Sequence, residues 1–172
     1  LQWQFVVDNR PGAGGNLGRA VANAFAERGA NLVLVDLQRE ALQNSFGASD
    51  ERRELAAANL LDQVEVDATV NKALARFGRL DGLCNIAGAF RMGPPVHETK
   101  DADWNFLFDV NARTVLHTAR AVVPGMLKAG GGKIINVGAY AAQKGVAGMG
   151  AYIASKSAVI RLTETMAAEL RE

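Results

Sequence analysis

Hydrophobic positions in the first quarter of the chain follow two different spacings, and each predicts a type of element. From Leu17 an apolar residue recurs at every fourth position, which predicts a helix over 17–28 with one buried face. Gly29 follows at the place where glycine commonly ends a helix. The next segment, 31–36, is an apolar run too short for a helix. It predicts a strand that is buried on both faces of a parallel sheet.

The same alternation of helical and strand-like patterns continues to the end of the sequence. Strands that alternate with helices predict a doubly wound α/β fold, in which a parallel sheet forms the middle of three α/β/α layers joined by right-handed crossovers. The further elements that we expect are a helix over 62–77, a strand over 80–85, one long helix or two joined helices over 101–123, a strand over 133–137, and a helix from Gly150 that still continues at Glu172.

Composition narrows the class of protein. The chain has 172 residues, of which 49% are hydrophobic and 22% charged, and this is typical of one globular domain spanning 1–172. The net charge of +1 gives no reason to expect nucleic acid or an anionic membrane as a partner. No apolar run approaches the ~20 residues that span a bilayer. The single cysteine, Cys84, excludes an internal disulfide, and no Cys/His cluster suggests a metal site, so we expect a reducing, cytoplasmic compartment.

A glycine-rich turn precedes the first predicted helix. Glycine allows a sharp turn and lets the backbone at a helix N-terminus approach a pyrophosphate, although such a turn can also be purely structural. Asp36 ends the second predicted strand, where a carboxylate can bind an adenosine ribose and would repel a 2′-phosphate. The combination predicts a dinucleotide site that prefers NAD, with NADP not excluded. The residues expected to line it in the turn are Gly12, Gly14, Gly15, Asn16, Leu17 and Gly18.

Tyr152 and Lys156 lie four positions apart, so they share one face of the last predicted helix. A tyrosine hydroxyl, with a pKa near ~10, is a poor base at neutral pH. An ammonium about 4 Å away favours the phenolate by roughly 4 kcal/mol at an effective dielectric constant near 20. The pair therefore predicts acid/base chemistry, and the alternative is an ordinary pair on a helix surface.

From about Gly12 to Glu172 the sequence resembles the short-chain dehydrogenase/reductase family. The motifs that carry the resemblance are the glycine turn, Asn85-Ile86-Ala87-Gly88, Asn111 and Tyr152-Ile153-Ala154-Ser155-Lys156. The resemblance implies a Rossmann-like fold and an oxidoreductase that transfers hydride between NAD(P) and a small hydroxy or carbonyl compound.

The resemblance also implies individual roles. Tyr152 would exchange a proton with the substrate oxygen, and Lys156 would lower the pKa of Tyr152 and hold the nicotinamide ribose. Asn111 would anchor a water relay to that lysine. The other cofactor contacts that it implies are Asn59, Asn85, Ala87 and Gly88.

The N-terminal residues depart from the family pattern. Pro11 stands where the family has threonine, Asn16 replaces a glycine, and the polar triplet 8–10 occupies the end of the first expected strand. Residues 6–18 also resemble a segment of the periplasmic receptors of tripartite tricarboxylate transporters. We therefore hypothesise that this end is not a normal dehydrogenase start, and a periplasmic carboxylate receptor is a further alternative.

A second departure affects the expected catalytic site. The family's serine, which steadies the substrate carbonyl, falls on Ala139, and losing such a donor typically costs ~10²–10³ in rate. Either Tyr140 takes its place as a catalytic donor or the substrate needs none. The rival to the enzyme is a catalytically weak or inactive nucleotide-binding module.

The family continues with further strands and a substrate loop, so we expect a fold that is incomplete at its C-terminal end. The strand at 133–137 should then form an exposed apolar edge, and the chain alone should be marginally stable, prone to aggregate and poor at binding substrate. The resemblance implies a homodimer or homotetramer through the fourth and fifth helices, the fourth being the one with Asn111.

Overall fold

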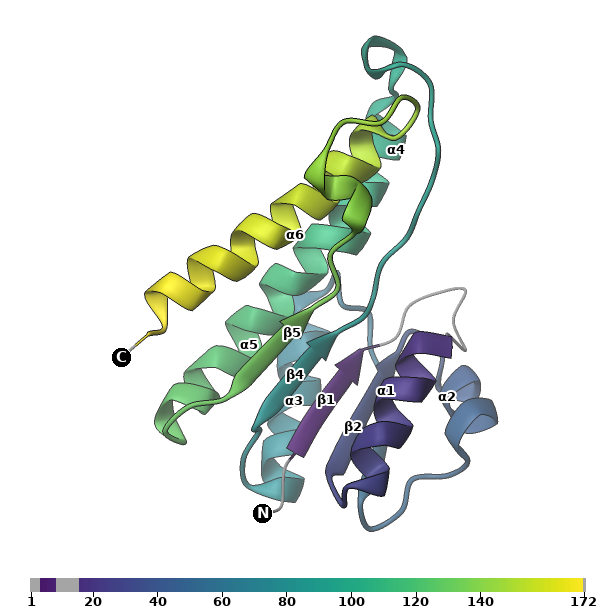
Figure 1. The fold of residues 1–172 in the computed structure, drawn as a ribbon. Helices are drawn as coiled ribbons and strands as arrows, with labels where there is room; N and C mark the ends of the chain where they lie inside the picture. Colours follow the sequence, from purple (N-terminus) through teal and green to yellow (C-terminus); the bar gives the residue numbers. More distant parts are fainter. Residues whose placement is uncertain (1–3, 9–15, 172) are drawn as a thin grey trace.

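The computed structural model describes residues 4–8 and 16–171, and within them five parallel strands form one sheet in the order β3-β2-β1-β4-β5 (Figure 1). The predicted doubly wound parallel sheet is therefore confirmed. The strands are β1 (Gln4–Asp8), β2 (Asn31–Asp36), β3 (Arg53–Ala57), β4 (Gly82–Asn85) and β5 (Lys133–Asn136).

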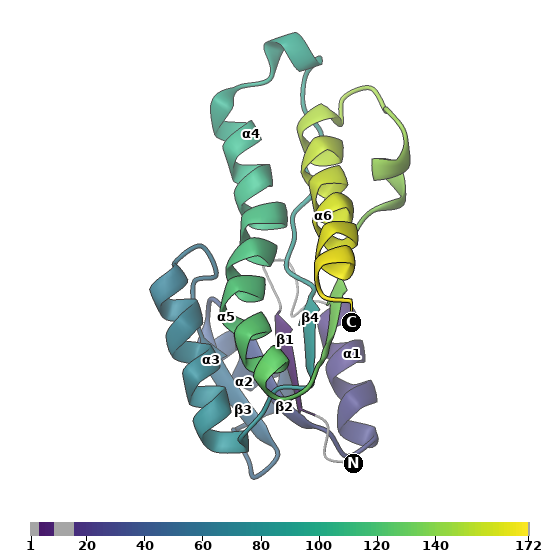
Figure 2. The same ribbon diagram turned by 90° about the vertical axis from the view of Figure 1, so that its left-hand side faces the viewer.

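Helices cover both faces of the sheet, which gives the three predicted layers (Figures 1 and 2). One face carries α1 (Asn16–Glu27) and α2 (Arg39–Phe46). The other carries α3 (Gln63–Phe77), α5 (Thr114–Lys128) and α6 (Gly150–Glu169), while α4 (Asp101–Phe108) and the first turns of α6 extend beyond the sheet as an arm.

Alternate residues of β2 supply the two halves of the core. Val33 and Val35 join the cluster under α3 and α5, whereas Leu32 and Leu34 join the cluster under α1 and α2. This follows from the strand geometry, which points successive side chains to opposite faces. A strand with apolar residues on both faces is buried between two helical layers, as its uninterrupted apolar run predicts.

The structure corrects two helix boundaries. The expected helix over 101–123 is α4 and α5 joined by the π-helical segment Asp109–Arg113, and it continues past Pro124 to Lys128. Pro124 removes only its own backbone donor near the end of α5, and Met126 beyond it is buried in the core. The helix expected to run through Glu172 ends at Glu169, where its last residues are exposed and no longer packed.

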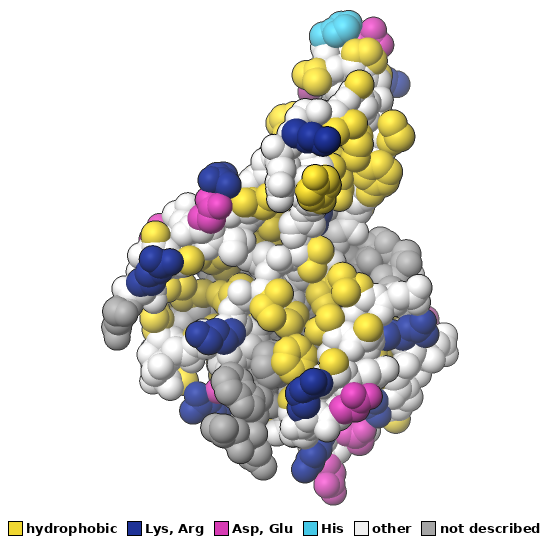
Figure 3. Space-filling view, viewed as in Figure 1, with side chains coloured by type: hydrophobic (Ala, Val, Ile, Leu, Met, Phe, Trp, Pro, Cys, Tyr) yellow, Lys and Arg dark blue, Asp and Glu magenta, His cyan; other side chains and the backbone are white. Residues whose placement is uncertain are grey.

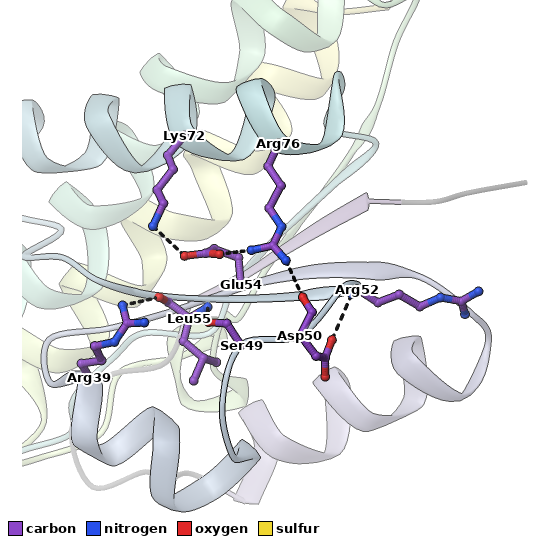
Figure 4. A network of polar contacts seen from close by, with 8 residues as sticks. All are labelled: Arg39, Ser49, Asp50, Arg52, Glu54, Leu55, Lys72 and Arg76. Carbon is purple, nitrogen blue, oxygen red and sulfur yellow. Dashed lines mark hydrogen bonds and ion pairs between the residues drawn. The ribbon is translucent and has the colours of Figure 1, made fainter.

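The two edge strands of the sheet, β3 and β5, differ in what covers their outer sides. On β3, the backbone of Leu55 is satisfied by side chains, since its N–H donates to Ser49 Oγ (3.1 Å) and its carbonyl accepts from Arg39 Nη1 (2.9 Å; Figure 4). Capping an edge in this way prevents it from pairing with another strand.

On the opposite edge, β5 pairs with β4 alone among the described residues, and Ile135 is 51% exposed. A largely apolar hollow lies on each side of β5, of about 340 Å³ toward α5 and α6 and about 330 Å³ toward α1. Hydrophobic side chains gather over the face between α1 and β5 (Figure 3). The predicted exposed apolar edge is confirmed for the described residues, and self-association through it stays a prediction.

A buried carboxylate joins β3 to α3. Glu54 is 5% exposed and forms ion pairs with Lys72 (2.7 Å) and Arg76, and Arg76 also donates to the Asp50 carbonyl (Figure 4). Burial alone would raise the pKa of Glu54, but the hydrogen bonds and charges of Lys72 and Arg76 outweigh it and hold the pKa below its ordinary value. The network therefore favours the ionised glutamate and anchors α3 on the sheet.

Replacing this carboxylate tests the network. Because the pKa of Glu54 is lowered in the folded chain, its stabilisation is present above the ordinary value of 4.5 and is lost as the pH falls through the folded-state value. We expect Glu54→Gln to lower the free energy of unfolding by about 1–3 kcal/mol at pH 7. Urea denaturation at several pH values should show that the difference in free energy of unfolding between the variant and the unmodified chain becomes smaller as the pH falls.

The matched control is Glu51→Gln, because Glu51 is an exposed acidic residue in the turn just before the strand. It should change the free energy of unfolding little at any pH. A Glu54→Gln chain as stable as the unmodified one at pH 7, or a gap independent of pH, would contradict the role of the network.

Candidate functional site

The sheet has a topological switch point between β1 and β4. The chain crosses from β1 to β2 in one direction along the sheet and later enters β4 on the other side of β1. In open α/β sheets such a reversal typically creates a crevice outside the carboxyl ends of the strands. Asp8 and Asn85, the last residues of the two strands, lie opposite each other in the register. Ligands of open α/β sheets bind at such a crevice.

Lys156 projects from α6 to the carboxyl end of β5. Its side chain is buried, the residue being 5% exposed, and Nζ donates a hydrogen bond to the Val137 carbonyl at 2.7 Å. Tyr152 lies one helical turn earlier on α6 and is partly buried. The two predicted residues therefore stand at the same end of the sheet as the crevice.

Gly88 brings the loop after β4 against this lysine. A Cβ atom built on Gly88 would lie 3.0 Å from Lys156 Nζ and 3.0 Å from Asn111 Oδ1. These distances are tighter than ordinary packing, so the close approach of backbone to ammonium depends on the missing side chain. The structure thus brings Gly88, Asn111 and Lys156 together, as the resemblance implies.

Asn111 ties the loop after β4 to α6. Its side chain is fully buried, accepts from Ala89 N (2.8 Å), donates to Ala89 O (3.0 Å) and donates to Ser155 Oγ (3.0 Å). Ser155 Oγ in turn donates to the Tyr152 carbonyl at 2.8 Å. Asn111 lies in the π-helical segment, a local widening of the helix that is frequent at functional sites. Its amide is thus a clamp between two parts of the site, and the water relay stays a prediction.

The pKa of Tyr152 shifts in the opposite direction from the one expected. Burial raises the pKa of Tyr152, and burial also lowers the pKa of Lys156. The expectation that Lys156 lowers the pKa of Tyr152 is wrong for this structure, because the ammonium is directed at the Val137 carbonyl and desolvation governs the phenol.

The predicted cofactor residues outside α6 lie at the same end of the sheet. Asp36 ends β2 and its Oδ1 accepts from Gln38 N at 3.3 Å, while Asn59 follows β3 and its Oδ1 accepts from Leu61 N at 3.1 Å. Ala87 is buried next to Gly88. These positions fit the expected cofactor contacts, which stay predictions.

The glycine turn is described only at its end. Asn16 begins α1 and its Oδ1 accepts from Arg19 Nη2 at 2.9 Å, Leu17 is exposed and Gly18 is buried. Three of the predicted residues, Gly12, Gly14 and Gly15, lie outside the described residues.

Asn85 has a structural role that the sequence does not show. Its amide donates to Asn136 Oδ1 (2.8 Å) and accepts from Thr118 Oγ1 (2.9 Å), and Asn136 continues the chain of contacts to Thr163 Oγ1 (2.9 Å). Both amide ends of Asn85, which is 2% exposed, are therefore used to join β4 and β5 to the helices. Its side chain is a structural tie, and the expected contact of Asn85 with the cofactor stays a prediction.

The position of the expected carbonyl donor, Ala139, is half-buried, and the residue after it is exposed. Ala139 precedes the 3₁₀ turn Tyr140–Gln143, and Tyr140 is 79% exposed. Tyr140 as a substitute donor stays a prediction. By contrast, Phe90 contacts Tyr152 directly, with ring centroids 4.9 Å apart and planes at 86°. Sequence reasoning missed Phe90, because a single aromatic residue in a loop carries no periodic signal.

Two further expectations concern the rest of the chain. Cys84 is buried in β4 and burial raises the pKa of its thiol to about 11, so its reactive thiolate is scarce at neutral pH. Within the described part of the chain, every helix is too short or too polar to span a bilayer.

Comparison with known proteins gives consistent matches. The family model described as short chain dehydrogenase matches residues 11–172. The chain is 34% identical over 155 residues to the sorbitol dehydrogenase of Cereibacter sphaeroides, a match that covers 90% of this chain and 60% of that protein. It is 35% identical over 161 residues to the D-threitol dehydrogenase of Mycolicibacterium smegmatis, with 92% and 62% covered.

A solved short-chain dehydrogenase/reductase from Burkholderia phymatum, in complex with NAD, superimposes with a TM-score of 0.88 at 33% identity. That match covers 99% of this chain and 60% of the other. An NAD⁺-bound xylitol dehydrogenase gives the same TM-score and identity, with 98% and 65% covered. The chain thus spans about three fifths of the length of the relatives it matches. Both the sequence and the structure therefore show that the chain belongs to the short-chain dehydrogenase family.

Proposed function

We propose that this chain binds a nicotinamide dinucleotide at the switch point and takes part in hydride transfer to or from a small hydroxy or carbonyl compound. The observation that carries the proposal is the meeting of Lys156, Gly88 and Asn111 at the carboxyl ends of β4 and β5, with Tyr152 one turn away. Bound NAD(P) would supply the hydride, and the chain's own groups would hold it and move the proton.

The described residues fit such a cofactor. Lys156 uses one of its three ammonium donors on Val137, so others are available for ribose hydroxyls. The absent side chain at Gly88 lets the Lys156 ammonium lie close to the backbone of the loop after β4, which holds this donor at the carboxyl ends of the strands. A carboxylate at Asp36 favours an unphosphorylated ribose and hence NAD, and the NAD-bound relatives support that choice.

Tyr152 would act on the proton. Because burial raises the pKa of Tyr152, its hydroxyl stays protonated at neutral pH and is suited to donate to a carbonyl oxygen during reduction. Alcohol oxidation would need the phenolate, so its rate should rise with pH. Relatives named for sorbitol, D-threitol and xylitol support a small polyol or its ketone as substrate.

We also propose that the chain is one nucleotide-binding domain that assembles into a homodimer or homotetramer through the fourth and fifth expected helices, which are the joined α4 and α5 and the following α6. Trp104 on α4 and Leu116 on α5 are 41% and 44% exposed and offer apolar surface that a second subunit could cover.

The second candidate is a nucleotide-binding module with little or no turnover. Ala139 favours it, because no hydroxyl stands where the family's serine would steady the carbonyl. Such a module would bind NADH and fail to oxidise it with any carbonyl compound.

Turnover with Tyr152→Phe separates the two candidates. Mixed with small ketones and NADH or NADPH, or with small polyols and NAD⁺ or NADP⁺, the unmodified chain should turn over, with the unphosphorylated cofactor preferred. Tyr152→Phe should lower kcat at least about 10²-fold while leaving the Kd for NADH nearly unchanged, because only the proton donor is removed. Cofactor binding without turnover in the unmodified chain would favour the module.

Tyr140→Phe tests the substitute donor in the same assay. If Tyr140 steadies the substrate oxygen, the variant should lose ~10²–10³ in kcat. Full activity would show that the substrate needs no donor at this position.

Gly88→Ala tests the close approach at the lysine. The added methyl group would meet Lys156 Nζ and Asn111 Oδ1 at 3.0 Å, so the ammonium should be displaced and the Kd for NADH should rise about tenfold or more. Gly93→Ala is the matched control, since a Cβ there has nothing within 4 Å. Equal NADH affinities in both variants, measured by calorimetry, would rule out this arrangement as the cofactor site.

A further inference from the structure

The ring of Phe90 stands edge-on against Tyr152. The centroids lie 4.9 Å apart and the planes meet at 86°, the edge-to-face geometry that aromatic pairs prefer. Phe90 comes from the loop after β4, whereas Tyr152 comes from α6, so the contact joins two segments that are distant in the sequence. Phe90 is also 55% exposed, which means that the contact does not arise from general core packing.

The residues on both sides of Phe90 are fixed. Before it, Ala89 exchanges two hydrogen bonds with the buried amide of Asn111. After it, Arg91 pairs with Asp103 at 3.2 Å, and its guanidinium lies 3.7 Å from the centroid of the Phe106 ring. These contacts hold the chain on both sides of Phe90, so the backbone at Phe90 is kept close to Tyr152.

We propose that Phe90 is a positioning residue for Tyr152, and that Asn111 acts on the tyrosine through it. The Phe90 ring restricts the orientation of the phenol and shields it from water on one side, so that the hydroxyl is presented to the crevice in one direction. This inference rests on the proposed role of Tyr152 as the proton donor. The loop after β4 would then orient Tyr152 in addition to contacting the cofactor.

The shielding has a consequence that can be measured without turnover. Burial raises the pKa of Tyr152, and the Phe90 ring supplies part of the apolar surface around the phenol. The chain has two tyrosines, so in a Tyr140→Phe background the near-ultraviolet absorbance of tyrosinate reports on Tyr152 alone.

The experiment is a pH titration of tyrosinate absorbance in that background, with far-UV circular dichroism to follow the fold. Phe90→Ala should lower the pKa of Tyr152 toward the ordinary value of about 10, because the ring that shields it is gone. Phe90→Leu keeps apolar volume, so its pKa for Tyr152 should lie between those of Phe90→Ala and the chain with Phe90. It serves as the second variant if Phe90→Ala does not fold. Met92→Ala is the matched control, since Met92 is 68% exposed in the same loop.

An unchanged pKa of Tyr152 in a folded Phe90 variant, or an equal fall in Met92→Ala, would overturn the proposal. In steady-state assays, Phe90→Ala should reduce kcat about two- to tenfold with a smaller change in KM. If the unmodified chain shows no turnover, the proposed function fails, whereas the titration still decides the role of Phe90.

Discussion

The buried ammonium of Lys156 is the constraint on which the site depends. A cation that is 5% exposed needs a polar partner, and the carbonyl of Val137 supplies it at the point where β5 ends. For that hydrogen bond to form, α6 must lie against the end of the sheet and the loop after β4 must have no side chain at Gly88. The clamp by Asn111 joins these two segments, so the geometry around one nitrogen atom determines how a helix, two strand ends and a loop meet.

The molecule holds a second buried charge in a different way. Glu54 is paired with Lys72 and Arg76, and its lowered pKa shows that the folded chain favours the ionised form. Lys156 is hydrogen-bonded to a neutral carbonyl, and burial lowers its pKa. The first arrangement satisfies the charge and stabilises β3 against α3. The second pairs the charge with a neutral carbonyl at the end of the sheet where we propose that the cofactor binds.

Much of this could be predicted from the residues alone. The periodicity of 17–28 and the apolar run of 31–36 give α1 and β2, because their side chains face well-defined environments. The spacing of Tyr152 and Lys156 places both on one face of α6. By contrast, β3 carries the charged Glu54 in its interior, so its burial depends on Lys72 and Arg76 from another part of the chain and gives no apolar run.

The features that sequence reasoning missed or reversed all depend on tertiary contacts. The direction of the Tyr152 pKa shift follows from desolvation, which spacing cannot show, and the side chain of Asn85 is engaged by Asn136 and Thr118 from other elements. The most direct test of the central claim is calorimetric titration of NADH into Lys156→Ala, with Lys144→Ala, an exposed lysine, as control. The account predicts that only Lys156→Ala weakens binding, by at least about tenfold. Equal affinity in both variants and the unmodified chain would contradict it.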